Sequence, residues 1–150
     1  MIQDIANRLT RMEERFNHFV RVGVVVSTKP ETGTVRVQFM DADGMVSHDL
    51  PALVPKTMED KHYHMPDVGE QVLAIFLPLG LEQGFVLGSF YSNSDQVPVQ
   101  DQNLHHVRFK DGTTVDYDRA RHLLKINCVG RVVVNSAVSV KVTAPNIELN

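Results

Sequence analysis

The N-terminal segment, residues 1–19, carries apolar side chains at alternating steps of three and four positions. This spacing predicts an amphipathic helix, because it places the apolar side chains on one stripe while charged residues fall outside it. We expect the stripe to pack on the chain's own domain or to dock on another chain, either a further copy or a hub protein. The stripe consists of Ile2, Ile5, Leu9, Met12, Phe16 and Phe19.

Residues 20–92 show short alternating patterns of the kind found in β-strands. Val22, Val24 and Val26 alternate with polar or small residues, a turn rich in polar residues follows at 29–33, and the alternation resumes at Val35. The two runs predict a β-hairpin.

The rest of this region predicts three more short strands. A turn at residues 41–44 leads to a short strand and then to a long, proline-bearing loop at 50–66, and apolar runs at 71–77 and 85–91 flank a turn at 80–84. Five short strands with a long middle connection favour a small barrel of the oligonucleotide- and oligosaccharide-binding (OB) type, because closing a sheet removes its exposed edges. Other small barrels fit the same pattern.

After a polar linker at residues 93–103, residues 104–150 repeat a strand pattern about every eight residues. One face of each strand is apolar, and a flat sheet would leave that face in water. We expect copies of this segment to wind around each other, or the segment to fold as a small meander on the barrel. The strand centres fall near Val107, Val115, Leu124, Val132, Val140 and Ile147. The other apolar positions are Phe109, Tyr117, Ile126, Val134, Val138 and Val142.

Composition narrows the functional classes. The chain of 150 residues has room for one domain plus an appended element. Its formal charge of -3, the absence of Trp and the lack of a basic run argue against nucleic acid as the main partner. A single cysteine excludes an internal disulfide framework and suits assembly in a reducing cytoplasm. The charged N-terminus lacks the apolar run of a signal peptide or membrane span.

Motifs for catalysis are missing from the sequence. It has no Gly-x-Ser-x-Gly turn, no glycine-rich phosphate loop and no Cys-x-x-Cys pair, so we expect no enzymatic activity. His62 and His64 form a His-x-His pair that would point both imidazoles to one side of a strand. They are weak candidates for a metal site, because they fall in the predicted loop and spacing is the one argument for them; a solvated or interface loop is the favoured interpretation.

Three stretches together resemble the baseplate assembly protein V family of contractile-tail phages, the central spike proteins, which are related to the spikes of contractile bacteriocins and type VI secretion systems. They are PDVGEQVLAIF (66–76), LEQGFVLGSFYS (81–92) and VRFKDGTTVDYDRARHLLKI (107–126). The resemblance implies an all-β chain with a short N-terminal helix, an OB barrel at the tail hub, and an intertwined trimeric β-helix over residues 104–150. The apolar faces from Val107 to Ile147 would then turn toward the trimer axis.

The same resemblance implies a function and a set of partners. The chain would be the structural spike of a virion tail baseplate, assembled in the bacterial host cytoplasm as a homotrimer that binds tail hub and baseplate proteins. It would cap the hub and puncture the host outer membrane when the sheath contracts. The alternative is an OB module that binds an oligonucleotide or a glycan, with accessory strands, although its basic residues do not cluster. Those residues include Arg21, Arg36, Lys56 and Lys61.

One feature of the family is missing from this sequence. Relatives often end in an apex that binds iron through a His-x-His pair from each of three chains, and no such pair follows residue 122 here. We therefore expect no cofactor within this chain and a stem that lacks its apex. Either the sequence stops before the tip, or a separate tip protein caps the stem.

Overall fold

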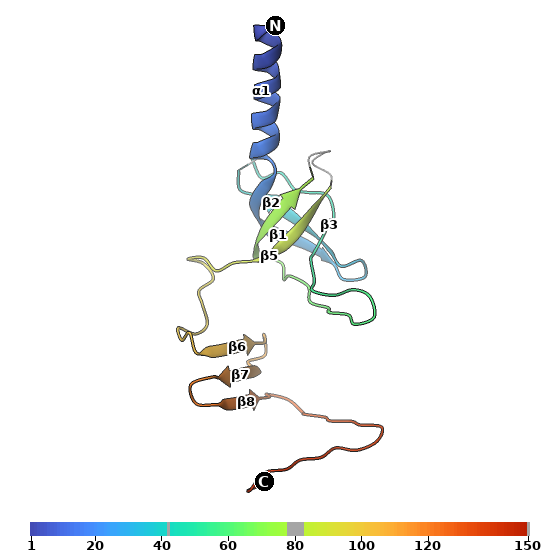
Figure 1. The fold of residues 1–150 in the computed structure, drawn as a ribbon, viewed down its shortest axis with the longest axis vertical. Helices are drawn as coiled ribbons and strands as arrows, with labels where there is room; N and C mark the ends of the chain where they lie inside the picture. Colours follow the sequence, from blue (N-terminus) through green and yellow to red (C-terminus); the bar gives the residue numbers. More distant parts are fainter. Residues whose placement is uncertain (42, 78–82, 150) are drawn as a thin grey trace. The chain divides into compact units, whose positions relative to one another are not determined.

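The computed structural model describes residues 1–41, 43–77 and 83–149. Chain contacts divide it into two compact units, Met1–Gln96 and Val97–Asn150. In chain order the elements are one helix followed by strands (Figure 1). Their bounds are α1 Ile2–Asn17, β1 Val20–Lys29, β2 Thr34–Phe39, β3 Leu50–Pro51, β4 Gln71–Phe76, β5 Gly84–Ser89, β6 Leu104–Arg108, β7 Thr114–Asp118 and β8 Leu123–Asn127.

The predicted N-terminal helix is present as α1, and it ends two residues earlier than its apolar stripe. Phe19 lies past the last helical residue, Asn17, because the carbonyl of Phe19 accepts a hydrogen bond from the backbone N–H of Phe76 at 2.8 Å and Val20 then pairs with Ile75. Pairing with β4 therefore makes the chain extended at this point. Within the part of the chain that the structure describes, no helix is long and apolar enough to cross a membrane.

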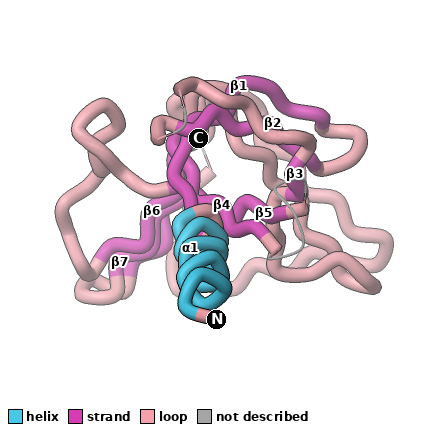
Figure 2. Tube along the Cα trace, turned by 90° about the horizontal axis from the view of Figure 1, so that it is seen from above, coloured by secondary structure: helices cyan, strands magenta, loops and turns pink. Residues whose placement is uncertain are grey.

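The first sheet has five strands in the order β3-β2-β1-β4-β5. All neighbouring strands are antiparallel, and β1 is long enough to pair with both β2 and β4. The two edges meet where Ala52 forms a parallel bridge to Val86 and the N–H of Leu53 donates to the Val86 carbonyl at 3.0 Å. The sheet curves around a common interior (Figure 2) and is a nearly closed barrel, as the sequence predicted.

The barrel interior is filled by a small apolar core. The inward positions of β2 follow the predicted alternation, and the rings of Phe39 and Phe76 meet edge to face with centroids 5.5 Å apart. Met65, from the long loop before β4, packs against this core. The buried apolar residues are Val25, Val35, Val37, Phe39, Leu50, Val72, Ala74, Phe76 and Val86.

In β1 the buried face is the opposite of the one that the alternation of Val22, Val24 and Val26 predicts. Arg21 and Val25 point inward and Gly23 is buried between them, whereas Val22 and Val26 are exposed on the outer surface. Gly23 explains the choice. A Cβ at this position would lie 2.4 Å from a methyl carbon of Val37 and 2.5 Å from a backbone oxygen of β2, so the inner side of β1 needs a residue without a side chain.

Two details of the barrel prediction were wrong in position. The short strand expected directly after residues 41–44 is an isolated bridge at Val46, and β3 lies at Leu50–Pro51, inside the stretch predicted to be a loop. A strand this short is stabilised by its pairing with β2, which local sequence does not reveal. Most of the turn predicted at 80–84 lies outside the described residues.

The second unit contains a three-stranded antiparallel meander, β6-β7-β8. The three strands contain the predicted centres Val107, Val115 and Leu124. The strands predicted around Val132, Val140 and Ile147 are not formed, and the described residues beyond Asn127 contain no strand (Figure 1). A strand needs a neighbour to satisfy its backbone N–H and C=O groups, and a single chain provides none for this segment.

Candidate assembly surfaces

The register of the meander gathers the predicted apolar residues on one face. Val107 lies opposite Val115, Val115 opposite Ile126, and Tyr117 opposite Leu124, and residues paired in this way share a face. Most of these side chains are 40% exposed or more, up to 62% for Leu124 and Ile126. Phe109, just after β6, is 52% exposed. The single chain therefore leaves this apolar face largely in water.

The opposite face of the meander is mostly polar, apart from Leu104 and Leu123, and its central polar side chains are paired within the chain. The His106 Nδ1 atom contacts the Asp116 carboxylate, and both side chains are at least four-fifths buried. The turns are held by side chains: Asp111 accepts the N–H of Thr113 at 2.9 Å, and Asp118 accepts the N–H of Ala120 at 2.9 Å. The unit therefore has one face that needs a partner and one that does not.

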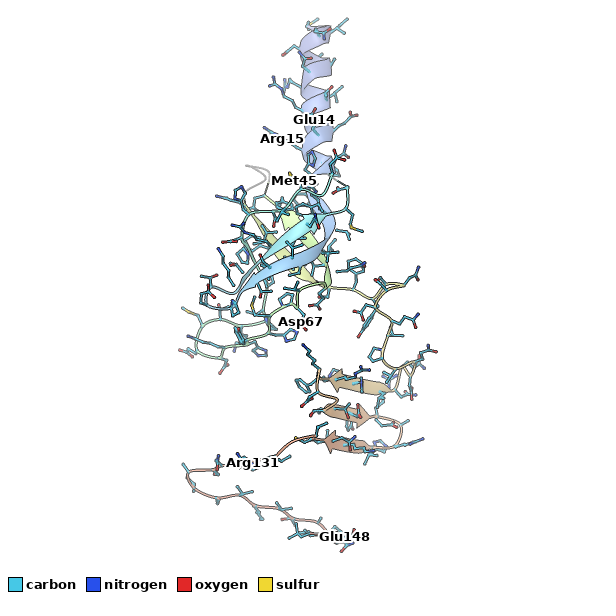
Figure 3. The ribbon with its side chains drawn as sticks, turned by 180° about the vertical axis from the view of Figure 1, so that it is seen from behind. Glu14, Arg15, Met45, Asp67, Arg131 and Glu148 are labelled. Carbon is cyan, nitrogen blue, oxygen red and sulfur yellow. The ribbon has the colours of Figure 1, made fainter. Side chains whose placement is uncertain are left out.

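The C-terminal segment, residues 128–149, exposes a further series of apolar side chains. Its side chains project from chain without regular structure, which turns back between the labelled Arg131 and Glu148 (Figure 3). All predicted apolar residues of this segment are more than half exposed, up to 94% for Val138. They are Val132, Val134, Val138, Val140, Val142 and Ile147. So much exposed β-branched surface is unusual for a chain that acts alone.

The apolar stripe of α1 is also uncovered. None of the residues of α1 is buried, and Ile2 and Phe16 are more than 80% exposed. Ile5, Leu9 and Met12, between them on the stripe, are more than half exposed. Packing of the stripe on the chain's own barrel is therefore not what the structure shows, and docking on another chain remains as the prediction.

The outer wall of the barrel carries an apolar patch that the sequence analysis missed. On the outer face of the sheet, Val20 lies opposite Ile75, Val22 opposite Leu73, and Ile75 opposite Phe85, and Val20 and Val22 are more than 40% exposed. A signal was present in the run at residues 71–77, which is apolar at successive positions rather than alternate ones. Such runs are typical of strands that are covered on both faces.

Electrostatics inside the barrel centre on Arg21. Its side chain is 1% exposed, its guanidinium carbon lies 4.0 Å from the centre of the Phe39 ring, and its Nη2 donates to Asp41 at 3.0 Å. Its Nε and Nη1 atoms are buried without a hydrogen-bond partner in the described structure. The hydrogen bond from Arg21 lowers the pKa of Asp41 below its ordinary value of 3.8. Asp41 therefore compensates a cation that the barrel encloses.

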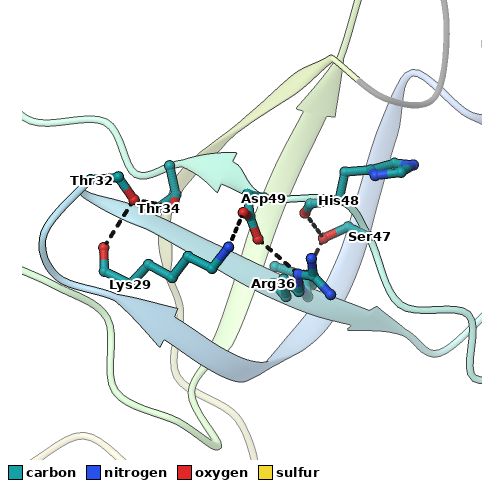
Figure 4. Close-up of polar contacts among 8 residues, drawn as sticks. Lys29, Thr32, Thr34, Arg36, Ser47, His48 and Asp49 are labelled. Carbon is teal, nitrogen blue, oxygen red and sulfur yellow. Dashed lines mark hydrogen bonds and ion pairs between the residues drawn. The ribbon is translucent and has the colours of Figure 1, made fainter.

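A second charged cluster joins β1, β2 and the segment before β3 (Figure 4). Asp49 contacts the Lys29 ammonium and accepts a hydrogen bond from Arg36 Nε at 2.7 Å. The hydrogen bond from Lys29, followed by that from Arg36, lowers the pKa of Asp49. Beside it, the backbone N–H of Val37 donates to Ser47 Oγ at 2.9 Å. The cluster is structural, because it fixes the segment that leads into the short β3.

The weak metal candidates belong to the first unit. His62 and His64 are exposed in the long loop between β3 and β4. Among the residues that the structure describes, no group of three or more His, Cys, Asp or Glu is placed to hold a metal ion.

Comparison with known proteins identifies the class of the barrel and then a relative of the whole chain. The family model of the type VI secretion system/phage-baseplate injector OB domain matches residues 21–91, which cover almost the whole barrel. The spike protein of Escherichia phage P2 is 30% identical over 144 residues, which are 96% of this chain and 64% of that protein. The chain thus spans a little under two thirds of that relative's length. Residues 21–91 therefore match an injector OB domain, and the chain as a whole is similar to a baseplate central spike protein.

Proposed function

We propose that the chain is the trimeric structural spike of a contractile-tail baseplate. Residues 104–150 of three copies wind into a β-helix, and the assembly caps the tail hub, contacts other baseplate proteins, and punctures the host outer membrane when the sheath contracts. The role is mechanical, without an enzymatic step, a cofactor in this chain or a nucleic-acid partner. Its place is the virion tail, after assembly in the host cytoplasm.

The observation that carries this proposal is the uncovered apolar series that runs from Val107 to Ile147. In β6 to β8 the series occupies one face of a formed sheet, and beyond Asn127 it continues on chain that has no strand neighbours in the described structure. Two further copies would provide both missing parts: apolar surface against the exposed face, and strand edges for the backbone of residues 128–149. The barrel of the same chain offers no such cover through its interior, since its core is already filled.

The relatives support the proposal at the level of the family. The matched family model is named for baseplate injectors, and the relative from phage P2 is a spike protein. A spike must stay intact under mechanical load. A stem whose strands are shared among three chains is suited to this role, because its chains can separate only if all three unfold.

The solution mass of the full chain tests the proposal. Native mass spectrometry should give a trimer, three times the 16.9 kDa of one chain. Sedimentation should show it to be elongated. A monomer at micromolar concentration would contradict the trimeric spike. A monomer that also bound single-stranded DNA in a salt-sensitive manner would favour the OB binding module instead.

A further inference from the structure

The apolar stripe of α1 has the positions of a short coiled coil. With Ile2 assigned to heptad position a, Ile5 falls at d, Leu9 at a, Met12 at d and Phe16 at a. All five are more than half exposed, and no residue of α1 is buried. A helix of 16 residues without tertiary contacts is marginal in water, so α1 needs a partner for this face.

The charges beside the stripe specify which partner fits. Position g of the first heptad is Arg8, and position e of the second heptad is Glu13. In a parallel, in-register coiled coil a g side chain reaches the e side chain of the next heptad on the neighbouring helix, so Arg8 of one copy would meet Glu13 of another. Neither side chain makes an ion pair within the described chain.

The same positions disfavour the antiparallel arrangement. There g faces g, which would bring Arg8 toward Arg15, two cations without a compensating carboxylate. Figure 3 shows Arg15 projecting from α1 beside Glu14. The opposite charges at g and e therefore select copies of α1 that run in the same direction, as chains around a common axis do. Isoleucine at both a and d of the first heptad favours three helices over two.

We propose that α1 of three copies forms a parallel, in-register coiled coil with ion pairs between Arg8 of one copy and Glu13 of the next. This inference rests on the proposed trimer, because two heptads associate weakly on their own. Three copies already joined through residues 104–150 hold their N-termini at a high effective concentration, and this makes a short coil stable.

Cysteine cross-linking of the full chain tests the coil. In a Cys128→Ser background, Leu9→Cys places a thiol at position a, near the axis, and Asn7→Cys places one at position f, on the outside. With a short bismaleimide, Leu9→Cys should give a covalent dimer and Asn7→Cys should not. Adding Arg8→Glu should reduce the Leu9→Cys product, and adding Glu13→Arg as well should restore it.

Native mass spectrometry of the same samples separates the two proposals. A trimer in which Leu9→Cys does not cross-link, or cross-links no better than Asn7→Cys, would overturn the coil and leave the spike intact; the stripe would then bind a different protein, such as a hub subunit. A trimer in which Arg8→Glu has no effect would overturn the ion pair and the register. A monomer would overturn both proposals.

Discussion

At the scale of single residues, Arg21 is the most consequential side chain of the barrel. It occupies an inward position of β1 beside Gly23, and its charge is balanced by Asp41, whose side chain is 56% exposed. A buried cation is costly when it has no partner, because its desolvation is then uncompensated. Removing Asp41 should therefore reduce stability by more than the intact ion pair contributes. The stacking of Arg21 on Phe39 ties this charge to the core.

Replacing Asp41 with Asn should lower the free energy of unfolding of the barrel by about 1–3 kcal/mol at neutral pH, because it leaves the Arg21 guanidinium with a weaker acceptor. Chemical denaturation followed by circular dichroism measures this. Asp43→Asn is the matched control, since Asp43 has a positive φ that Asn also adopts and makes no ion pair in the described structure. Equal effects of the two substitutions would contradict the role of the pair.

The same pair gives the stability a pH dependence of known sign. The folded state lowers the pKa of Asp41, so its contribution is present above the ordinary value of 3.8 and is lost as the pH falls through the lower, folded value. The difference in stability between the natural chain and Asp41→Asn should therefore be constant near neutral pH and shrink below about pH 4. A difference that grew on acidification would have the wrong sign.

At the scale of elements, the meander of β6, β7 and β8 shows how the same alternation has different outcomes. Pairing with its neighbours gives each strand one apolar and one mostly polar face, and on the polar face His106 contacts Asp116 and Asn127 donates to Thr114. Residues 128–149 have the same kind of alternation and form no strand in one chain. The difference is whether a neighbouring strand is present. Tight turns bring β6 against β7 and β7 against β8, whereas no strand in the described chain pairs with residues 128–149.

Two adjacent leucines of β8 test which face of the meander is shared. Leu124 lies on the apolar face, and Leu123 lies on the polar face, so the pair provides the same substitution on opposite sides. Leu124→Asp should abolish or greatly weaken the trimer, because it would bury a carboxylate against other copies, whereas Leu123→Asp should leave it intact. Sedimentation equilibrium measures both, and a trimer that survives Leu124→Asp would show that this face is not the interface.

At the scale of the whole molecule, the two units obtain their stability in different ways. The barrel buries its nine core residues within one chain. In the second unit no apolar side chain among the described residues is buried, so its apolar surface is left for a partner to cover. Folding of the barrel and assembly of the stem should therefore be separable, with the barrel stable in a chain that cannot trimerise.

Val134→Asp tests this separation. The substitution places a carboxylate in the proposed stem interface and should convert the trimer to monomers, because an unpaired charge is costly to bury. Hydrogen exchange should still show protected amides in β1, β2 and β4, as in the natural chain. Ser139→Asp, at a position of the same segment that the alternation assigns to the polar side, should leave both the trimer and the barrel unchanged. Loss of barrel protection together with the trimer would refute the separation.

The sequence by itself determined the helix, four of the five barrel strands and the apolar series from Val107 to Ile147. Each of these follows from local periodicity: steps of three and four for α1, steps of two for β2 and for the strands from Val107 to Ile126. Sequence similarity then identified residues 21–91 as an injector OB domain and a phage spike protein as a relative. The same periodicity could not show which face of β1 points inward, because alternating valines fit either face and only the contact between Gly23 and β2 decides.

Only the tertiary structure decided what is covered and what is not. It closed the barrel through contacts between residues far apart in the chain, such as Ala52 with Val86, and it buried Arg21 against Asp41. It also showed that α1 and residues 128–149 have no cover within the described chain. Burial depends on which surfaces meet in space, and a one-dimensional pattern records only that a side chain is apolar, not whether another surface lies against it.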